Sequence, residues 1–513
     1  MSDNGPLSVE LSSMRQVATV DERFQSYNIE MAEVIGGDFW KPYDEMDVSR
    51  GSSADVASTS AQGVADFQIG DAGTGMFQAR PPVDLSRRRL RALAAALGPA
   101  YVRVSGTWAN SVWFHDSGDP APERPPDGFQ GILTRKQWAG VVAFAEAVDA
   151  KIVTSFAISQ GVRDASGVWT ADQAKRILDY TKAAGGSIAA AELFNEPTLA
   201  AMGGAPRGYD ASMFARDEAV FRSFLKKAAP GALAVGPGSA GEGVDLIPES
   251  MPMLTSEHLL SGSPRITFDV FSYHFYGAVS QRCASLGAEM TTTAGAALSE
   301  EWLSRTEHVF AFYERLRDRF QPGKPIWLTE TADAACGGNP WAVTFLDSFR
   351  YLDQLGRLAR RGVSVYMHNT LASSEYGLID QSTLIPRPNY WAALLWRRLM
   401  GEVVLDAGPS QSGLHLYAHS LLDRPGGVAL LAINLDRTTT VTLESPMPAD
   451  RFTLTARVLE GAEVQLNGHD LALGPNGELP DLEGVRIRAG RVELAPASIT
   501  FLAFPDVGYG SVA

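Results

Sequence analysis

Two glutamates stand where short apolar runs of the sequence end. Glu196 lies in the segment 191–197, AELFNEP, and Glu330 lies in the segment 324–331, KPIWLTET. Cleavage of a glycosidic bond with retention needs one carboxylic acid to protonate the leaving oxygen and a second, ionised carboxylate to attack the anomeric carbon. A barrel that places both groups at the ends of its strands supplies this geometry. We therefore take Glu196 and Glu330 as the candidate catalytic pair.

The neighbours of the pair fit the same chemistry. Asn195 precedes Glu196, and its amide can hydrogen-bond a sugar 2-hydroxyl, which marks Glu196 as the acid/base. His274 and Tyr276 close the apolar segment that comes before that of Glu330. A tyrosine hydroxyl there could donate to the nucleophile, and a histidine could contact the carboxylate or the sugar. A histidine among aromatic residues is more often a satisfied core group, but the position at the end of a strand favours a functional role for both residues. Glu192 is expected to be a paired, structural group inside the barrel.

Eight apolar runs alternate with helix-period segments between about residues 24 and 400, which predicts a (β/α)8 TIM barrel. A doubly wound open sheet is the competing fold, but no glycine-rich phosphate turn follows the early strands. The predicted helices are 86–97, 136–148, 171–184, 213–229, 303–320 and 343–361. The predicted strands are Phe24–Glu30, Tyr101–Ser105, Ile152–Ser159, Ala189–Asn195, Leu233–Gly236, Phe268–Tyr276, Pro325–Glu330 and Val363–His368.

After residue 401 the sequence changes to short alternating segments separated by Gly, Pro, Asn and Asp. This pattern predicts a C-terminal antiparallel β-sandwich. We expect three parts: residues 1–22, which add strands to the sandwich, the catalytic barrel over 23–400, and the sandwich over 401–513. The segment Gly51–Thr74 is rich in Ser, Ala and Gly and predicts a long irregular loop.

Composition limits the class of protein. The chain has 513 residues, 45% apolar and 20% charged, with a formal net charge of −15. These values predict a soluble protein that binds neither nucleic acid nor a membrane, because no apolar stretch approaches the roughly 20 residues that span a bilayer. No signal peptide is visible. We expect a periplasmic or secreted protein if a leader was removed, and a cytoplasmic one otherwise.

The chain resembles glycoside hydrolase family 79, which includes heparanases and β-glucuronidases. The resemblance is carried by the segments 97–107, 191–197, 273–276, 327–338 and 388–399, and in the sandwich by 432–435 and 464–468. It implies that Glu196 is the acid/base and Glu330 the nucleophile. It also implies sugar-contacting or nucleophile-supporting roles for Asn195, Thr107, His274 and Tyr276, and contacts from Glu30 to ring hydroxyls.

In that family a Gly-Gly turn after the nucleophile and a Tyr after strand eight recognise the uronic carboxylate. The matching residues here are Gly337, Gly338 and Tyr376. Backbone N–H groups at such a turn can bind an anion without a cationic side chain. The chain departs from the animal heparanases because the loop from Glu330 is one residue longer, with Cys336 in place of a Tyr, and because basic clusters are missing. Both departures disfavour cleavage of heparan sulfate.

Cys283 and Cys336 are the two cysteines of the chain, and both are expected in loops after adjacent barrel strands. They could form a disulfide at the rim of the pocket, and two buried free thiols are the alternative. Neither belongs to a metal-binding pattern. We expect no metal and no organic cofactor, and the sequence leaves the oligomeric state open.

These observations predict a retaining, exo-acting β-glucuronidase whose substrate is a glucuronide or another glycan that contains uronic acid. One alternative keeps the chemistry and changes the substrate to a neutral β-glycoside. A second is an endo-acting heparanase or hyaluronidase, and a third is a carbohydrate-binding protein on an inactive hydrolase scaffold.

Overall fold

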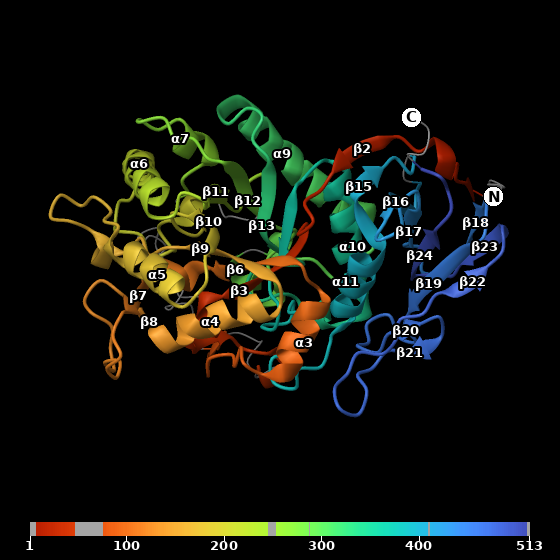
Figure 1. Cartoon of the computed structure of the whole chain (residues 1–513), viewed down its shortest axis with the longest axis horizontal. Coiled ribbons are helices and arrows are strands. Elements are labelled where there is room, and N and C mark those ends of the chain that lie inside the picture. Colours follow the sequence, from red (N-terminus) through yellow and green to blue (C-terminus); the bar gives the residue numbers. More distant parts are fainter. Residues whose placement is uncertain (1–6, 47–74, 245–252, 287, 409–410, 510–513) are drawn as a thin grey trace.

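The structure is a computed structural model that describes residues 7–46, 75–244, 253–286, 288–408 and 411–509. Within this part of the chain, eight parallel strands close into a barrel in sequence order, with the eighth pairing to the first. The TIM-barrel prediction is therefore confirmed (Figure 1). The strands are β3 (Gln25–Glu30), β6 (Ala100–Ser105), β9 (Ala150–Ser155), β10 (Ile188–Glu192), β11 (Leu233–Ser239), β12 (Val270–Tyr276), β13 (Ile326–Ala332) and β14 (Val365–His368).

Two strands end earlier than predicted, β9 at Ser155 and β10 at Glu192. Asn110 explains the difference, because it supplies hydrogen bonds that a longer sheet would supply. Its carbonyl accepts from the backbone N–H groups of residues 158 and 159 at 2.8 and 3.1 Å. Its side chain bonds the backbone N–H and carbonyl of Asn195 at 2.8 and 3.0 Å. The chain can thus leave the barrel before it reaches Glu196.

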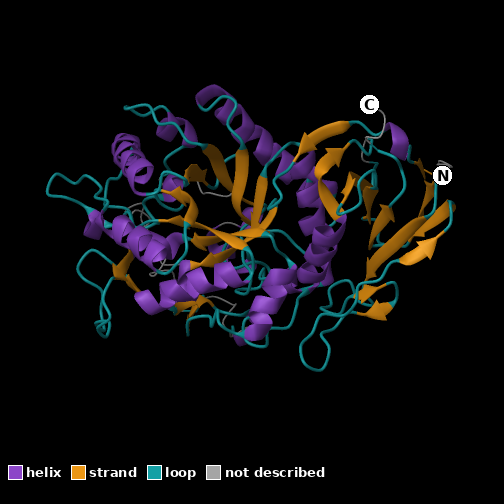
Figure 2. Ribbon diagram, in the orientation of Figure 1, coloured by secondary structure: helices purple, strands orange, loops and turns teal. Residues whose placement is uncertain are grey.

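Helices surround the barrel (Figure 2). Their starts follow ordinary capping chemistry: Thr134 and Gln137 form a capping box at α4, and Asp210 accepts from an N–H of the first turn of α6. The predicted helix 303–320 is divided at Ser304. The helices are α1 (Met31–Ile35), α3 (Arg88–Ala96), α4 (Arg135–Ala147), α5 (Asp172–Ala183), α6 (Ala211–Ala228), α7 (Ser256–Leu260), α8 (Glu300–Leu303), α9 (Arg305–Phe320), α10 (Phe345–Arg360) and α11 (Pro388–Leu399).

Two small sheets follow barrel strands. β4 (Gly37–Trp40) pairs antiparallel with β5 (Phe77–Arg80) after β3, and β7 (Val112–His115) pairs parallel with β8 (Gly131–Thr134) after β6. Both sheets therefore belong to the end of the barrel where the strand carboxyl ends lie. The loop predicted at Gly51–Thr74 falls outside the described residues.

Two further sheets form the second domain, which lies to the right of the barrel in Figure 1. All pairs are antiparallel except β1 with β18. The nine-stranded sheet contains β2 (Gln16–Thr19), β15 (Met400–Leu405), β16 (Leu414–Leu421), β17 (Val428–Asn434), β19 (Ala449–Thr455), β20 (Gln465–Leu466), β21 (His469–Asp470), β22 (Val485–Ile487) and β24 (Ser498–Phe504). The three-stranded sheet contains β1 (Leu7–Ser8), β18 (Val441–Ser445) and β23 (Gly490–Leu494).

The central strands of the nine-stranded sheet, β16, β17 and β24, are buried on both faces. Along β16, Leu414, Leu416 and Ala418 enter the core shared with the three-stranded sheet, whereas Tyr417 and Leu421 join the core of the barrel. α10 and α11 lie between barrel and sheet in Figure 1, which is why nearly every residue of α10 is buried. The domain limits at residues 22 and 400 stay a prediction. In the described part of the chain, no helix is long and apolar enough to cross a membrane.

Candidate active site

Glu196 and Glu330 both lie at the end of the barrel where the strand carboxyl ends meet. Glu330 belongs to β13, whereas Glu196 lies in the turn just after β10, with a left-handed backbone (φ 51°, ψ 63°). That conformation is uncommon for a residue with a Cβ. Pro197 follows and begins a short 3-10 helix. The two side chains are 13% and 7% exposed, so both carboxylates are largely buried.

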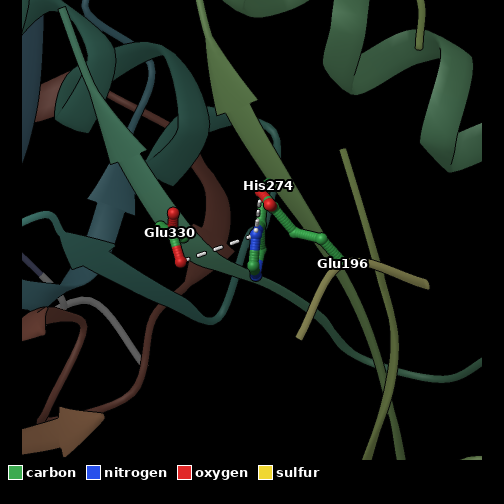
Figure 3. Close-up of side chains that lie close together, drawn as sticks. All are labelled: Glu196, His274 and Glu330. Carbon is green, nitrogen blue, oxygen red and sulfur yellow. Dashed lines mark hydrogen bonds and ion pairs between the residues drawn. The ribbon is translucent and has the colours of Figure 1, made fainter. Parts of the chain in front are cut away.

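His274, on the neighbouring strand β12, stands between the two carboxylates (Figure 3). Its Nδ1 lies 3.0 Å from Oε1 of Glu196 and 3.7 Å from Oε2 of Glu330. One oxygen of each glutamate and a ring nitrogen of His274 all lie within 4.8 Å of one another. The structure therefore brings this pair and His274 into one constellation.

Arg103, at the middle of β6, is a residue that the sequence reasoning did not single out. Its side chain is 1% exposed, and it donates to Glu330 Oε2 at 2.9 Å, to Glu192 Oε2 at 2.9 Å and to Asn195 Oδ1 at 2.8 Å. The signal in the sequence was one arginine inside a buried strand, since such a cation needs buried acceptors. The prediction that Glu192 is paired inside the barrel is confirmed.

Tyr276 holds the other oxygen of Glu330. Its hydroxyl donates to Oε1 at 2.6 Å and accepts from Nδ2 of Asn369 at 3.0 Å. Burial and the charge of Glu330 raise the pKa of Tyr276 well above its ordinary value, so the hydroxyl keeps its proton. Glu330 thus receives one hydrogen bond from a cation and one from a neutral hydroxyl.

Asn369 connects Tyr276 to Glu30 and Tyr376. It follows the last residue of β14, and its amide also donates to Oε1 of Glu30 at 3.0 Å and to the hydroxyl of Tyr376 at 3.3 Å. Sequence reasoning missed it, although its position directly after a barrel strand was a signal. Glu30 and Tyr376 are thereby brought to the site with Tyr276.

Burial controls the protonation of the site. It raises the pKa of Glu196 to about 7, against the attraction of Arg103. It lowers the pKa of His274 to about 4, so the imidazole is neutral at pH 7. Because Arg103 can only donate, the His274 Nε2 that lies 3.3 Å from it must be an acceptor, and Nδ1 carries the hydrogen that points to Glu196.

Glu30 carries a buried oxygen without a hydrogen bond. Oε2 has no partner among the described residues, and burial together with the charge of Glu330 raises the pKa of Glu30 well above its ordinary value. A Cβ on Gly106 would lie 1.6 Å from this oxygen, so only glycine fits there. Thr107, the next residue, is half-buried and has no hydrogen bond from its side chain within the described chain.

The turn after β13 contains three successive residues with positive φ, namely Cys336 (61°), Gly337 (81°) and Gly338 (83°). Within the described part of the chain, the N–H groups of Gly337 and Gly338 have no acceptor. A Cβ on Gly338 would lie 3.1 Å from Tyr376, which places the turn beside that ring. Cys336 is joined to Cys283 by a disulfide.

A metal ion would find three candidate ligands in Glu196, His274 and Glu330. The guanidinium of Arg103, however, already lies 2.9 Å from a Glu330 oxygen and 3.3 Å from the imidazole of His274. A second cation between the same groups would be repelled by the first. The arrangement therefore suits acid–base and nucleophilic chemistry by carboxylates better than metal chemistry.

Comparison with known proteins identifies the family. A family model described as "Glycosyl hydrolase family 79, N-terminal domain" matches residues 82–356, more than half of the chain. "Heparanase-like protein 1" of Arabidopsis thaliana is 27% identical over 485 residues, which cover 83% of this chain and 85% of that protein. "Baicalin-beta-D-glucuronidase" of Scutellaria baicalensis is 32% identical over 210 residues, 39% of this chain and 40% of the relative.

Among solved structures, a 4-O-alpha-L-rhamnosyl-beta-D-glucuronidase from Fusarium oxysporum 12S has the same fold. Its TM-score is 0.61 at 13% identity, with 97% of this chain and 100% of the other covered. The fold, the pair of carboxylates and the family match agree, and the resemblance noted in the sequence is confirmed. The protein belongs to glycosyl hydrolase family 79 and is a glycoside hydrolase.

Proposed function

We propose that this protein is a retaining, exo-acting β-glucuronidase in which Glu330 is the nucleophile and Glu196 the acid/base. One observation carries the assignment of roles: Glu330 is bonded by the cation Arg103 and by Tyr276, whereas Glu196 is bonded by the neutral imidazole of His274. Charge-assisted donors of this kind orient the Glu330 carboxylate for attack on the sugar. The raised pKa of Glu196, about 7, suits a group that must first give up a proton and later take one.

The spacing of the carboxylates supports retention. Retaining enzymes hold the two groups roughly 5–5.5 Å apart, and inverting enzymes hold them roughly 6.5–9.5 Å apart to admit a water molecule. Here one oxygen of Glu196 and one of Glu330 lie within 4.8 Å. This distance favours direct attack by Glu330 on the sugar.

The reaction then has two steps. In the first, an oxygen of Glu330 bonds to C1 while the bond from C1 to the aglycone oxygen breaks, and Glu196 transfers its proton to that oxygen. In the second, the ionised Glu196 removes a proton from water, the water oxygen bonds to C1, and the ester to Glu330 breaks. Asn195 is positioned by Arg103 to bond the 2-hydroxyl, and the unpartnered oxygen of Glu30 is available to a ring hydroxyl.

Two features support the proposal that the substrate carries an acidic sugar at the end of a glycan. Among the described residues the N–H groups of Gly337 and Gly338 have no acceptor, which leaves them available to a carboxylate. The hydroxyl of Tyr376 lies near the same place, beside Asn369. Both catalytic carboxylates are largely buried, with 13% and 7% of their side chains exposed, which suits a reaction from which bulk water is excluded.

A substrate panel tests the proposal. We expect hydrolysis of 4-nitrophenyl β-D-glucuronide with kcat/KM well above that of 4-nitrophenyl β-D-glucoside. The reverse order would contradict the assignment of the sugar. A second candidate is cleavage within a polymer, which the name of the heparanase-like relative favours. Digestion of a uronic-acid polymer distinguishes the two, because an exo-enzyme releases single sugars and an endo-enzyme releases fragments.

A further inference from the structure

Arg282 is buried behind the glycine turn and uses every N–H of its guanidinium. It follows β12, and its side chain is 0% exposed. Nη1 donates to the carbonyls of Cys336 and Gly338 at 3.1 and 3.0 Å, and Nε donates to the carbonyl of Lys41 at 3.0 Å. Nη2 donates to the Lys41 carbonyl at 2.8 Å and to Glu375. A guanidinium has five N–H groups, so this one has none left for a substrate.

Two further hydroxyls fix the same carbonyls. The ring of Tyr43 lies 3.9 Å from the guanidinium carbon of Arg282, and its hydroxyl donates to Gly338 at 3.1 Å. Ser280 donates to the carbonyl of Cys336 at 2.9 Å. The carbonyls of Cys336 and Gly338 therefore each accept two hydrogen bonds on the side of the turn where Arg282 lies.

These bonds determine where the N–H groups of the turn point. In a planar trans peptide the C=O of one residue and the N–H of the next point in opposite directions. The bond from Arg282 to the carbonyl of Cys336 thus turns the N–H of Gly337 away from Arg282. The carbonyl of Gly337 accepts from the backbone N–H of Glu375 at 3.1 Å, which in the same way fixes the N–H of Gly338.

We propose that Arg282 is a positioning residue that sets the preference of the enzyme for an acidic sugar. It orients the amides of Gly337 and Gly338 as a receptor for the carboxylate of the substrate, and it places a positive charge one peptide behind them. This inference rests on the proposed function. It adds that the selectivity depends on a side chain that never contacts the sugar.

The substitution Arg282→Lys tests this role. Lysine keeps the charge, but its three donors on one nitrogen cannot reproduce a fork that reaches two segments and Glu375. We expect KM for 4-nitrophenyl β-D-glucuronide to rise about tenfold or more, the factor that loss of one well-made charged hydrogen bond gives. Turnover of 4-nitrophenyl β-D-glucoside should be unchanged, so the ratio of the two kcat/KM values falls.

The matched control is Arg305→Lys. Arg305 also lies after β12, where it donates to the carbonyl of Gly277 at 2.7 Å and lies over the ring of Trp302. It does not contact the glycine turn, so its substitution should leave the ratio unchanged. An equal fall in both activities of Arg282→Lys, or an unchanged ratio, would overturn the proposal.

A second variant and the substrate preference of the wild-type protein complete the test. If Arg282→Lys does not fold, Ser280→Ala removes the second hydrogen bond to the carbonyl of Cys336 and so loosens the peptide that carries the N–H of Gly337. This variant should lower the ratio by about two- to fivefold, and a ratio equal to that of the wild type would overturn the proposal. If the wild-type protein itself does not prefer the glucuronide, the proposed function fails, and the role of Arg282 fails with it.

Discussion

Two buried charge clusters of this protein use the same residue types for different ends. At the end of the barrel, Arg103 forms ion pairs with Glu192 and Glu330. Its charge also lowers the pKa values of Glu30 and Glu196, against the effect of burial. Between the domains, Asp353 of α10 accepts from His415 and Tyr417 of β16 at 2.6 Å each, and from Arg357 at 2.6 Å.

The difference lies in how completely each cluster is paired. None of the buried polar atoms of Asp353, Arg357 or His415 lacks a hydrogen bond within the described chain. Burial alone would raise the pKa of Asp353, but the bonds from His415 and the charge of Arg357 hold it below its ordinary value. In the barrel, by contrast, one oxygen of Glu30 and one of Glu192 have no hydrogen-bond partner among the residues that the structure describes.

Burying more carboxylates than cations costs free energy, and burial shifts the pKa values of the surplus carboxylates. The fully hydrogen-bonded cluster around Asp353 therefore stabilises the contact between the domains, whereas the incompletely paired cluster around Arg103 has the shifted pKa values that catalysis uses. Substitutions in the two clusters should therefore separate stability from activity.

The largest effect is expected from Glu330→Gln, which removes the nucleophile and keeps its shape. We expect kcat for 4-nitrophenyl β-D-glucuronide to fall by a factor on the order of 10⁴ or more. Because the change removes one acid from a cluster that has too many, the melting temperature should be equal or higher. A substantially lower melting temperature would contradict the claim that this site buries more carboxylates than cations.

The substitution Asp353→Ala makes the opposite prediction. It removes the buried partner of Arg357 and His415 and leaves them only Glu300 and Glu307, which are 58% and 28% exposed. Breaking a buried pair costs about 3–5 kcal/mol. We expect the free energy of unfolding in urea to fall by that amount, while kcat per folded molecule is retained. Loss of kcat without loss of stability would break the comparison.

Tyr276→Phe should have an intermediate effect on activity. The change removes the hydroxyl that donates to Glu330 at 2.6 Å and keeps the ring. A hydrogen bond to a charged group contributes about 1.5–3 kcal/mol, so kcat should fall by about 10- to 100-fold. Tyr417→Phe is the matched control, because the hydroxyl of Tyr417 donates to Asp353 at the same distance, 2.6 Å, in the cluster between the domains. We expect that control to change stability only.

The smallest expected effect concerns pH. Since the pKa of Glu196 is raised from 4.5 to about 7, the folded protein keeps a proton in that window which the unfolded chain releases. Stability is therefore lost as pH rises through the window, and kcat/KM falls above about pH 7 as the proton donor ionises. Glu196→Gln should raise the free energy of unfolding at pH 8 and not at pH 4. Equal effects at both pH values would contradict the raised pKa.

The eight barrel strands could be predicted because strands buried on both faces are continuous apolar runs. Glu196 and Glu330 could be identified because each comes where such a run ends. For Arg103 and Asn369 the sequence offers only their positions as signals, because their roles depend on acceptors supplied by other strands: Glu192 for the arginine, and Glu30 for the amide. The role of Asn110 in ending β9 and β10 depends in the same way on contacts far apart in sequence.

One measurement tests the assignment of roles most directly. Incubation with a 2-deoxy-2-fluoro-β-D-glucuronide that carries a good leaving group should form a glycosyl-enzyme whose second step is slow, because fluorine destabilises the charged transition state. Mass spectrometry of the digested protein locates the attached sugar. We expect the label on Glu330, and a label on Glu196 or on any other residue would contradict the assignment of Glu330 as the nucleophile.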